Sequence, residues 1–377
     1  MKLLFCGDIM PGGVLHYQTD TVSNEMQDYL SNFDYRIGTL ECAIGQDLPF
    51  DKDKMDYEFG KNIVYACDSD INLLNRLKID IVSLANNHFY DLSHQGLVNT
   101  ITLLDKNGIK HCGAGLNLQE ASKPVVLIKD GLSLAIIGCC IKGCPPWLVT
   151  PATKSTSGIY QPNISELCLY IQQLKCKYDK VVIMPHWCKE YNYLPIPQCI
   201  DYAKQIVSAG ADAIMGSHTH SIHPFVSIEG VPVAFSMGNF VFPDIQVAPP
   251  RPMFYPSDKS VINDLPRITC YPNIVRQKSL AVWPYKSRIG LMVELMTDSE
   301  EIRHSYRLSR LSRDNKLLLY KGKKEIIRLR LLNLITLSNY YALIYKISLI
   351  PGDFKKIFMR ILTEIILIKR KLTNANR

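Results

Sequence analysis

The sequence has no apolar run long enough to cross a membrane as a helix. Such a helix needs about 18 or more consecutive apolar residues. The nearest approach, Leu331 to Ile350, is interrupted by two asparagines and a lysine. There is also no internal repeat and no low-complexity tract. The sequence therefore predicts no spanning helix and excludes a repeat architecture.

The 12 cysteines form neither a disulfide framework nor a thiolate metal motif. No CxxC pair occurs, and Cys139, Cys140 and Cys144 come nearest to a cluster. Several others lie within apolar runs, as buried free thiols do in a reducing compartment. The start of the chain also lacks a signal peptide, since Met1–Cys6 leads directly into Gly7-Asp8. We therefore expect a cytoplasmic protein with reduced thiols.

Positive charge is concentrated at the C-terminal end. The chain of 377 residues has a formal charge of +8, which gathers after Arg303 among segments rich in leucine and isoleucine. We expect a basic helical extension over residues 301–377, following a main domain over residues 1–300. The basic residues form either a solvated helix face or a surface for peripheral contact with an anionic membrane, and the first is favoured.

Short apolar runs alternate with amphipathic stretches up to about residue 245, which predicts an α/β fold with sheets covered by helices. Residues 246–286, rich in proline and aromatics, are expected to form a long irregular loop. The expected strands are Lys2–Cys6, Tyr35–Thr39, Ile79–Leu84, Val125–Ile128, Leu134–Gly138, Lys180–Met184, Ala213–Met215, Val233–Ser236 and Arg288–Leu295. The expected helices are Asn24–Leu30, Ser69–Leu77, Gln95–Lys106, Ile164–Tyr178 and Ile196–Ala209.

Polar residues able to bind metals follow the carboxyl ends of these strands, where sites assemble in open α/β sheets. The strongest signal is the HxH pair His218 and His220, because alternate residues of an extended chain point to one side. Asn87 and His88 close another strand, although an asparagine there is by itself more often a cap. The set is Asp8, Glu41, Asn86, Asn87, His88, His186, His218, His220 and Asn239.

Taken singly, each of these residues has an ordinary structural explanation. Asp8 or Glu41 alone would more often be a turn or capping residue, and His186 alone a satisfied structural histidine. Together, two carboxylates, one amide and three imidazoles form a mixed nitrogen and oxygen set that suits zinc, manganese or iron. The sequence therefore predicts a metal site at one sheet edge.

The motifs that carry these residues occur in an order that resembles one family, the CapA capsule and poly-γ-glutamate synthesis family. That family is similar to the calcineurin-like metallophosphoesterase superfamily. The resemblance covers roughly residues 1–241. It rests on Gly7-Asp8-Ile9-Met10, Thr39-Leu40-Glu41, Ala85-Asn86-Asn87-His88, His186-Trp187-Cys188-Lys189-Glu190-Tyr191, Gly210-Ala211-Asp212 with Gly216-Ser217-His218-Thr219-His220, and Phe235-Ser236-Met237-Gly238-Asn239-Phe240.

The resemblance implies a four-layer αββα sandwich with two divalent ions at one sheet edge. Asp8 and His220 would bind one ion, Glu41 would bridge, and Asn87, His186 and His218 would bind the other. His88 would donate a proton beside the substrate, with Asn87 at its side, and Glu190 and Asn239 are second-tier candidates. The superfamily usually has a histidine where Met10 stands, so one nitrogen ligand is missing. Thr39 and Cys188 also depart from the expected residues.

Two functional hypotheses follow from the residues and the resemblance. The first is a metal-dependent hydrolase of the phosphoesterase type, in which metals activate water. The second is a weakly catalytic or non-catalytic component that binds polymer during capsule synthesis. Both expect an anionic small molecule or polymer as the partner, and neither expects nucleic acid.

Overall fold

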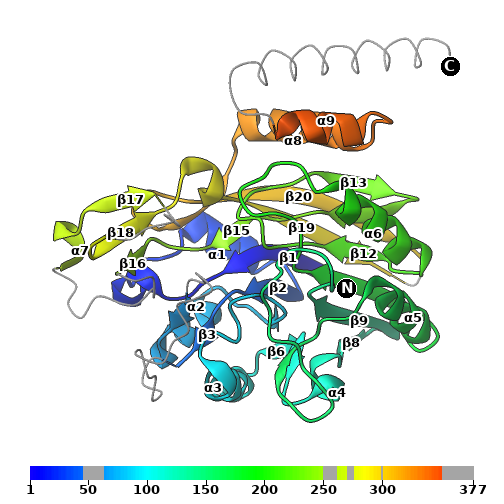
Figure 1. Cartoon of the computed structure of the whole chain (residues 1–377), viewed down its shortest axis with the longest axis horizontal. Helices are drawn as coiled ribbons and strands as arrows, with labels where there is room; N and C mark the ends of the chain where they lie inside the picture. The colour runs from blue at the N-terminus through cyan, green and yellow to red at the C-terminus, as the bar shows by residue number, and fades with distance from the viewer. Residues whose placement is uncertain (46–62, 249–260, 270–275, 299, 350–377) are drawn as a thin grey trace.

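Two β-sheets form the centre of the protein, whose computed structural model describes residues 1–45, 63–248, 261–269, 276–298 and 300–349. The larger sheet has eight strands in the order β21-β20-β19-β1-β2-β5-β6, with β15 also paired to β1 (Figure 1). Its strands are β1 Lys2–Ile9, β2 Tyr35–Leu40, β5 Ile81–Ser83, β6 Lys110–Cys112, β15 Asn239–Val241, β19 Ile289–Thr297, β20 Ile302–Leu311 and β21 Leu317–Tyr320. The described chain is thus a mixed α/β structure.

The second sheet has six strands in the order β13-β14-β12-β11-β9-β8. These are β8 Val125–Lys129, β9 Leu132–Cys139, β11 Lys180–Pro185, β12 Ala213–Met215, β13 Phe225–Ile228 and β14 Val231–Ala234. Strands β9, β11, β12 and β14 run parallel. Their carboxyl ends therefore meet at one edge of the sheet.

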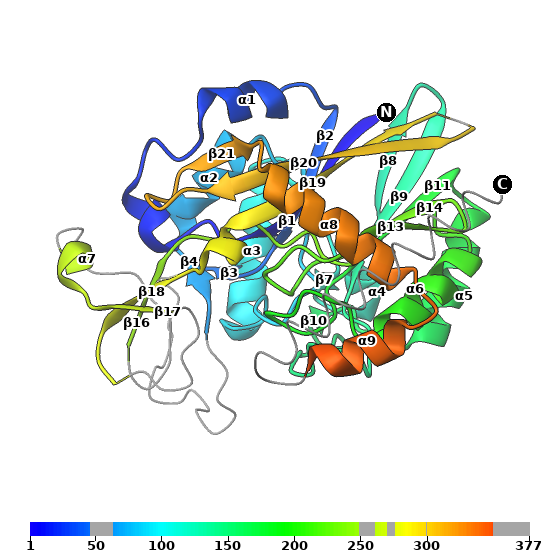
Figure 2. The ribbon, with the colours of Figure 1, turned by 90° about the horizontal axis from the view of Figure 1, so that it is seen from above.

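Alternation along the strands decides what each sheet face packs against. Leu3 and Phe5 of β1 join one apolar cluster with residues of β9, β11 and β12 in the other sheet. Leu4 and Cys6 instead pack with helices α1, α2 and α3. Ile183 of β11 packs with α5 and α6 (Figure 2). These helices are α1 Asn24–Leu30, α2 Ile71–Arg76, α3 Ser93–Lys106, α5 Ile164–Lys175 and α6 Pro197–Ser208.

Some of the helices begin at capping residues that the sequence supplies. Ser23 accepts a hydrogen bond from the Met26 backbone N–H at the start of α1. Asn163 and Glu166 form a reciprocal capping box at the start of α5, which satisfies two otherwise unpaired backbone donors. These signals explain why α1 and α5 begin at their expected residues, Asn24 and Ile164.

Smaller elements surround the two sheets. Residues 246–286 were expected to be irregular, but their described part contains two strands and a short helix. The two strands form a three-stranded sheet with β16 at one end of the molecule (Figure 1). That expectation is therefore wrong for these segments. They are β16 Ile245–Val247, α7 Val261–Asp264, β17 Arg267–Thr269 and β18 Ser279–Val282; the remaining short elements are β3 Ala43–Ile44, β4 Tyr65–Ala66, β7 Ala114–Gly115, α4 Leu118–Ala121 and β10 Gly158–Ile159.

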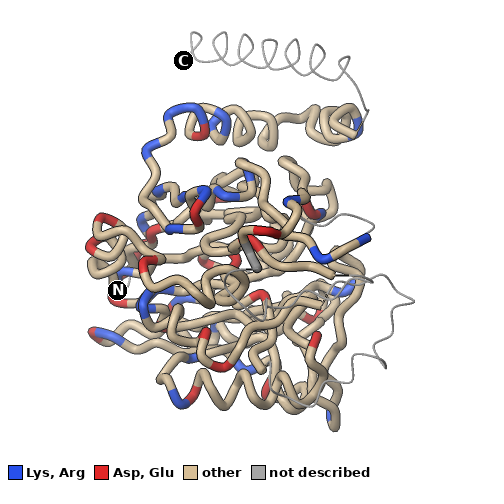
Figure 3. Tube along the Cα trace, turned by 90° about the vertical axis from the view of Figure 1, so that its left-hand side faces the viewer, with Lys and Arg blue, Asp and Glu red and all other residues tan. Residues whose placement is uncertain are grey.

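The basic helical region begins later than expected. Residues 302–320 form β20 and β21, which pair with β19 and with each other in the larger sheet. The expectation of helix from residue 301 is therefore wrong for this segment. Helices α8 Lys323–Thr336 and α9 Tyr341–Ser348 follow, and α8 carries much of the basic charge (Figure 3).

The rest of the expected extension, from residue 350, lies outside the described residues. Within the described chain, no helix combines the length and apolar character needed to cross a bilayer. Peripheral membrane contact of the basic region stays a prediction, which co-sedimentation with anionic vesicles would test.

A substitution at Gly7 tests the crowding that places the end of β1. A Cβ at Gly7 would lie 1.8 Å from the Gly238 carbonyl oxygen. We expect Gly7→Ala to lower the free energy of unfolding by about 3 kcal/mol or more, because backbone cannot yield as a side chain can. Gly131→Ala, with open space but a φ of +77°, should cost only about 1–2 kcal/mol. Urea unfolding measures both; equal losses would contradict the steric argument.

Candidate metal centre

Asp8 lies at the carboxyl end of β1, between two parallel neighbours. It pairs in register with Thr39 of β2 and with Asn239 of β15. Its backbone N–H donates to the Gly238 carbonyl at 2.9 Å. Glu41 follows β2 directly, and its N–H donates to the Ile9 carbonyl at 2.9 Å. The sheet therefore carries both carboxylates to one edge, where each is fully buried.

The histidine pair follows β12 on a turn with left-handed backbone. His218 has a φ of 100° and His220 a φ of 52°. The pair was expected to converge because an extended chain alternates its side chains, and that explanation is wrong. The turn positions the two imidazoles instead, in backbone conformations that residues with a Cβ rarely adopt.

The predicted ligand atoms form two groups that share Glu41. In each group the candidate atoms lie within 4.8 Å of one another: Glu41, His186 and His218 in one, and Asp8, Glu41 and His220 in the other. The nearer Glu41 oxygen lies 3.6 Å from His186 Nε2 and 3.7 Å from His220 Nε2. This arrangement places Glu41 where a bridging ligand would stand.

Asn87 joins the group of His186 and His218. Its Oδ1 lies 2.9 Å from His186 Nε2, and His218 Nδ1 lies 3.1 Å from the same nitrogen. Asn86 lies beside it but has a different role. Its amide donates to the Leu40 carbonyl and accepts from the His88 backbone N–H, so it fixes the loop.

Hydrogen bonds on the far side of two imidazoles leave their inner nitrogens directed at the ligand groups. His186 Nδ1 lies 2.8 Å from Ser217 Oγ. His220 Nδ1 lies 2.9 Å from Asn239 Oδ1, while Asn239 Nδ2 donates to the Ser287 carbonyl. Because that donation fixes Oδ1 as the acceptor, His220 carries its proton on Nδ1 and offers Nε2 as a ligand. Asn239 is thus placed to orient His220.

His88 is held by a buried carboxylate that the sequence reasoning missed. Its Nδ1 lies 2.7 Å from Asp91 Oδ2, and the Asp91 side chain is fully buried. Asp91 also accepts from the Val64 backbone N–H. The spacing of three residues after His88 was the available signal. The second-tier candidate Glu190 is half-buried and belongs to neither ligand group.

The electrostatics of the centre fit divalent cations. Asp8 Oδ1 and both Glu41 oxygens are buried and find no hydrogen-bond partner within the described part of the chain. Burial raises the pKa of Asp8 to about 7, and burial together with the Asp8 charge raises the pKa of Glu41. Burial also lowers the pKa of His220 to about 3. A bound cation would compensate the carboxylates, and the neutral imidazoles suit coordination.

Burial keeps the other two imidazoles, those of His186 and His218, in the neutral form as well. Burial, followed by repulsion from neighbouring imidazoles, lowers the pKa of His186 and of His218 well below the usual range.

Met10, which stands where the resemblance leads one to expect histidine, is buried in an apolar cluster. Its sulfur accepts from the Gly12 backbone N–H at 3.3 Å, so it faces a local turn.

Aromatic rings enclose His220. The Trp283 centroid lies 4.9 Å and the Phe242 centroid 5.3 Å from its ring. Tyr191 stacks on it at 5.7 Å and is 39% exposed. These rings exclude water on one side of the centre and leave Tyr191 at the surface.

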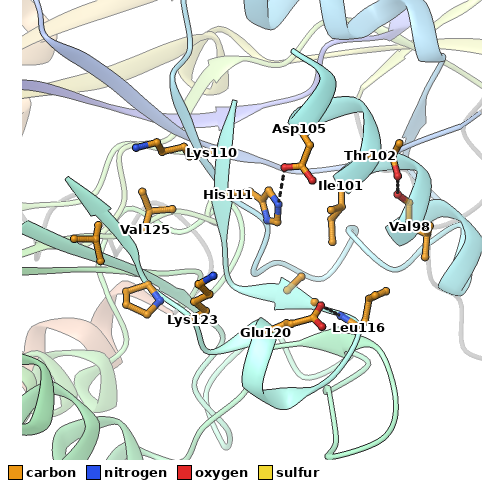
Figure 4. A pocket seen from close by; sticks show the side chains of 14 residues that line it. Val98, Ile101, Thr102, Asp105, Lys110, His111, Leu116, Glu120, Lys123 and Val125 are labelled. Carbon is orange, nitrogen blue, oxygen red and sulfur yellow. Dashed lines mark hydrogen bonds and ion pairs between the residues drawn. The ribbon is translucent and has the colours of Figure 1, made fainter. Parts of the chain in front are cut away.

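A cavity of about 600 Å³ lies elsewhere, between α3, β6, α4 and β8 (Figure 4). Asp105 Oδ1 and His111 Nε2 lie 3.5 Å apart in its lining. None of the predicted site residues lines it among those described. The cavity is therefore separate from the candidate metal centre.

Fold and site together define an α/β protein with a buried centre of carboxylates and imidazoles at the edge where strands of both sheets end. Residues 2–244 match the family described as "Bacterial capsule synthesis protein PGA_cap". The match covers more than half of the chain, which therefore belongs to this family, the CapA family that the motifs resemble. The family is part of the metallophosphoesterase-like superfamily.

Two relatives carry capsule or polymer names. The capsule biosynthesis protein CapA of Bacillus anthracis is 31% identical over 257 residues, which cover 64% of this chain and 60% of that protein. The PGA biosynthesis protein CapA of Bacillus subtilis (strain 168) is 26% identical over 244 residues, covering 63% and 62%. The chain thus spans less than two thirds of the length of either relative.

Among solved structures, the NAD nucleotidase of Haemophilus influenzae is 12% identical, with a TM-score of 0.40. The match covers 88% of this chain and 55% of that one.

The raised pKa of Asp8 predicts a pH dependence in the metal-free protein. The carboxyl titrates near 3.8 when unfolded and near 7 when folded, so folding favours its protonated form. Its contribution to the free energy of unfolding should be present below about pH 4 and be lost as the pH rises through 7. Urea unfolding in chelator should therefore show wild type losing stability relative to Asp8→Asn over this window. A difference that stays constant with pH would contradict the prediction.

Proposed function

We propose that this protein is a metal-dependent hydrolase of the phosphoesterase type that holds two divalent ions, of manganese, zinc or iron. The observation that carries the proposal is the pair of ligand groups sharing Glu41, with buried carboxylate oxygens that lack hydrogen-bond partners in the described chain. We also propose that the two sheets and their outer helices form the four-layer αββα sandwich of this superfamily. The division of apolar clusters between the two faces of β1 supports that arrangement.

In this proposal, Asp8 and His220 hold one ion, and Asn87, His186 and His218 hold the other. Glu41 belongs to both sets. Bound ions would lower the pKa of water and offset negative charge on a phosphoryl group. Asn239 keeps Nε2 of His220 unprotonated, and Ser217 contacts Nδ1 of His186.

His88 would act as the general acid. Asp91 holds its Nδ1 and leaves Nε2 as the atom that can give a proton to a leaving oxygen. Burial first and then repulsion, to which His88 contributes, lower the pKa of His186, His218 and His220. The half-buried Asn87 lies where it can contact both the ligand set and an incoming group.

We place this activity in the synthesis of capsule or poly-γ-glutamate, with an anionic small molecule or polymer as the substrate. The names of the two Bacillus relatives support this context. The second candidate is a component that binds polymer during assembly with little or no catalysis. Met10 favours it, because its sulfur faces a local turn in place of an imidazole ligand. Bound metal without turnover would distinguish this candidate from the hydrolase.

Metal content tests the shared position of Glu41. Elemental analysis should find about two ions per wild-type chain, as dinuclear phosphatase sites hold. Because Glu41 belongs to both groups, Glu41→Ala should remove both ions, whereas His220→Ala and His218→Ala should each remove one. His304→Ala is the matched control, since that histidine is exposed on β20. Metal-free wild type, or equal loss in all four variants, would contradict the proposal.

The role of His88 separates catalysis from metal binding. We expect His88→Ala to lower kcat for a generic aryl phosphate ester by about 10²–10⁴-fold, the usual contribution of a general acid. Metal content should stay unchanged, because His88 belongs to neither ligand group. Asp91→Asn should lower kcat less, since it only orients the imidazole. Loss of metal from His88→Ala would instead identify His88 as a ligand.

A further inference from the structure

Two adjoining cavities lie beside the metal centre, on the turn that precedes β19 and the turn that follows β20. Their volumes are about 330 and 400 Å³, and Tyr285, Arg288 and Arg313 line both. We call them together the arginine groove. Its other named lining residues are Arg267, Val282, Trp283, Arg310, Leu311, Ser312 and Asp314.

Positive charge dominates this groove. Four guanidinium groups line it against the single carboxylate of Asp314 among the described lining residues. Arg288 is buried and paired with Asp244, so its charge is largely compensated. Arg267 and Arg313 are exposed and form no ion pair with any described residue. These two groups therefore remain available to a ligand.

The groove and the metal centre share a wall. Trp283 lines the groove, and its ring lies 4.9 Å from the ring of His220. A second connection runs through the 3-10 turn Tyr285–Arg288. Tyr285 and Arg288 line the groove, while the Ser287 carbonyl accepts from the Asn239 amide that orients His220. The Trp283 side chain thus lies between the groove and His220 of the ligand groups.

The lining favours carboxylates over phosphates. Guanidinium forks form paired hydrogen bonds with carboxylates and with phosphates alike, so the preference comes from the rest of the lining. Neither an α-helix N-terminus nor a glycine-rich loop, the recurrent phosphate-binding devices, appears among the described lining residues. Two adjoining cavities with separate arginines also suit repeated anionic groups better than a single one.

We propose that the arginine groove binds the carboxylates of an extended polyanionic chain, one unit of which lies at the metal centre. The placement of that reacting unit rests on the proposed hydrolase function. Binding in the groove does not, because Arg267 and Arg313 belong to neither ligand group.

Fluorescence anisotropy of a labelled glutamate oligomer with the full chain tests the groove. Arg267→Gln combined with Arg313→Gln should weaken binding about tenfold, as expected for two charge-assisted contacts at an exposed site. The matched control combines Arg303→Gln with Arg307→Gln on β20, which removes the same charge at exposed positions paired with Asp298, Glu301 and Glu294. The control should change affinity less than about twofold.

Equal effects of the two double variants would overturn the proposal, since binding would then follow net charge alone. A groove that binds polyphosphate but not the glutamate oligomer would overturn the assignment to carboxylates. His220→Ala separates this proposal from the hydrolase: it should lose turnover and still bind the oligomer. Oligomer binding that depends on Arg267 and Arg313, in a wild type without turnover, would support the groove and reject the hydrolase. Turnover together with oligomer binding that does not depend on Arg267 and Arg313 would support the hydrolase and reject the groove.

Discussion

The fold buries two carboxylates, Asp8 and Glu41, so that Asp8 Oδ1 and both Glu41 oxygens find no hydrogen-bond donor within the described chain. Unpaired buried oxygens cost free energy, and a buried charge costs more. Burial accordingly favours the protonated carboxyls and the neutral imidazoles, so the metal-free centre carries little of the charge its residues could hold. Divalent cations would reverse this preference for the carboxylates while leaving the imidazoles neutral, as coordination requires. A bound cation would therefore stabilise the ionised forms of these two carboxylates.

The backbone around these carboxylates is shaped to keep them there. Gly7 lets β1 approach the Gly238 carbonyl more closely than any side chain would allow, and this contact sets the depth of Asp8. His218 and His220 adopt left-handed conformations on the turn that faces Asp8, where the His218 backbone N–H donates to Asp8 Oδ2 at 3.1 Å. Strain of this kind persists only where surrounding contacts impose it. The close packing at the end of β1 and the strained turn thus both position the Asp8 carboxylate.

Elements with local signals could be predicted from the sequence, and contacts between distant residues could not. Helix Asn24–Leu30 has its expected bounds because Ser23 caps it. The strand-end position of Asp8 followed from a short apolar run before a glycine. The strand Ile302–Leu311 was not predicted, because its basic residues resemble those of the helical region that follows, although Tyr306 and Leu308 alternate with polar residues as in a half-exposed strand. The contacts of Asp91 with Val64 and of Asn239 with Ser287 join segments far apart in sequence, so no spacing rule reveals them.

The 3-10 turn Tyr285–Arg288 connects the metal centre with the arginine groove. Its Ser287 carbonyl fixes the orientation of Asn239, which in turn fixes the proton of His220. The Arg288 side chain donates to the Trp283 carbonyl and pairs with Asp244, holding the turn against the core. Because both the groove lining and the Asn239 contact depend on this turn, a change in its position would affect the groove and Nε2 of His220 together.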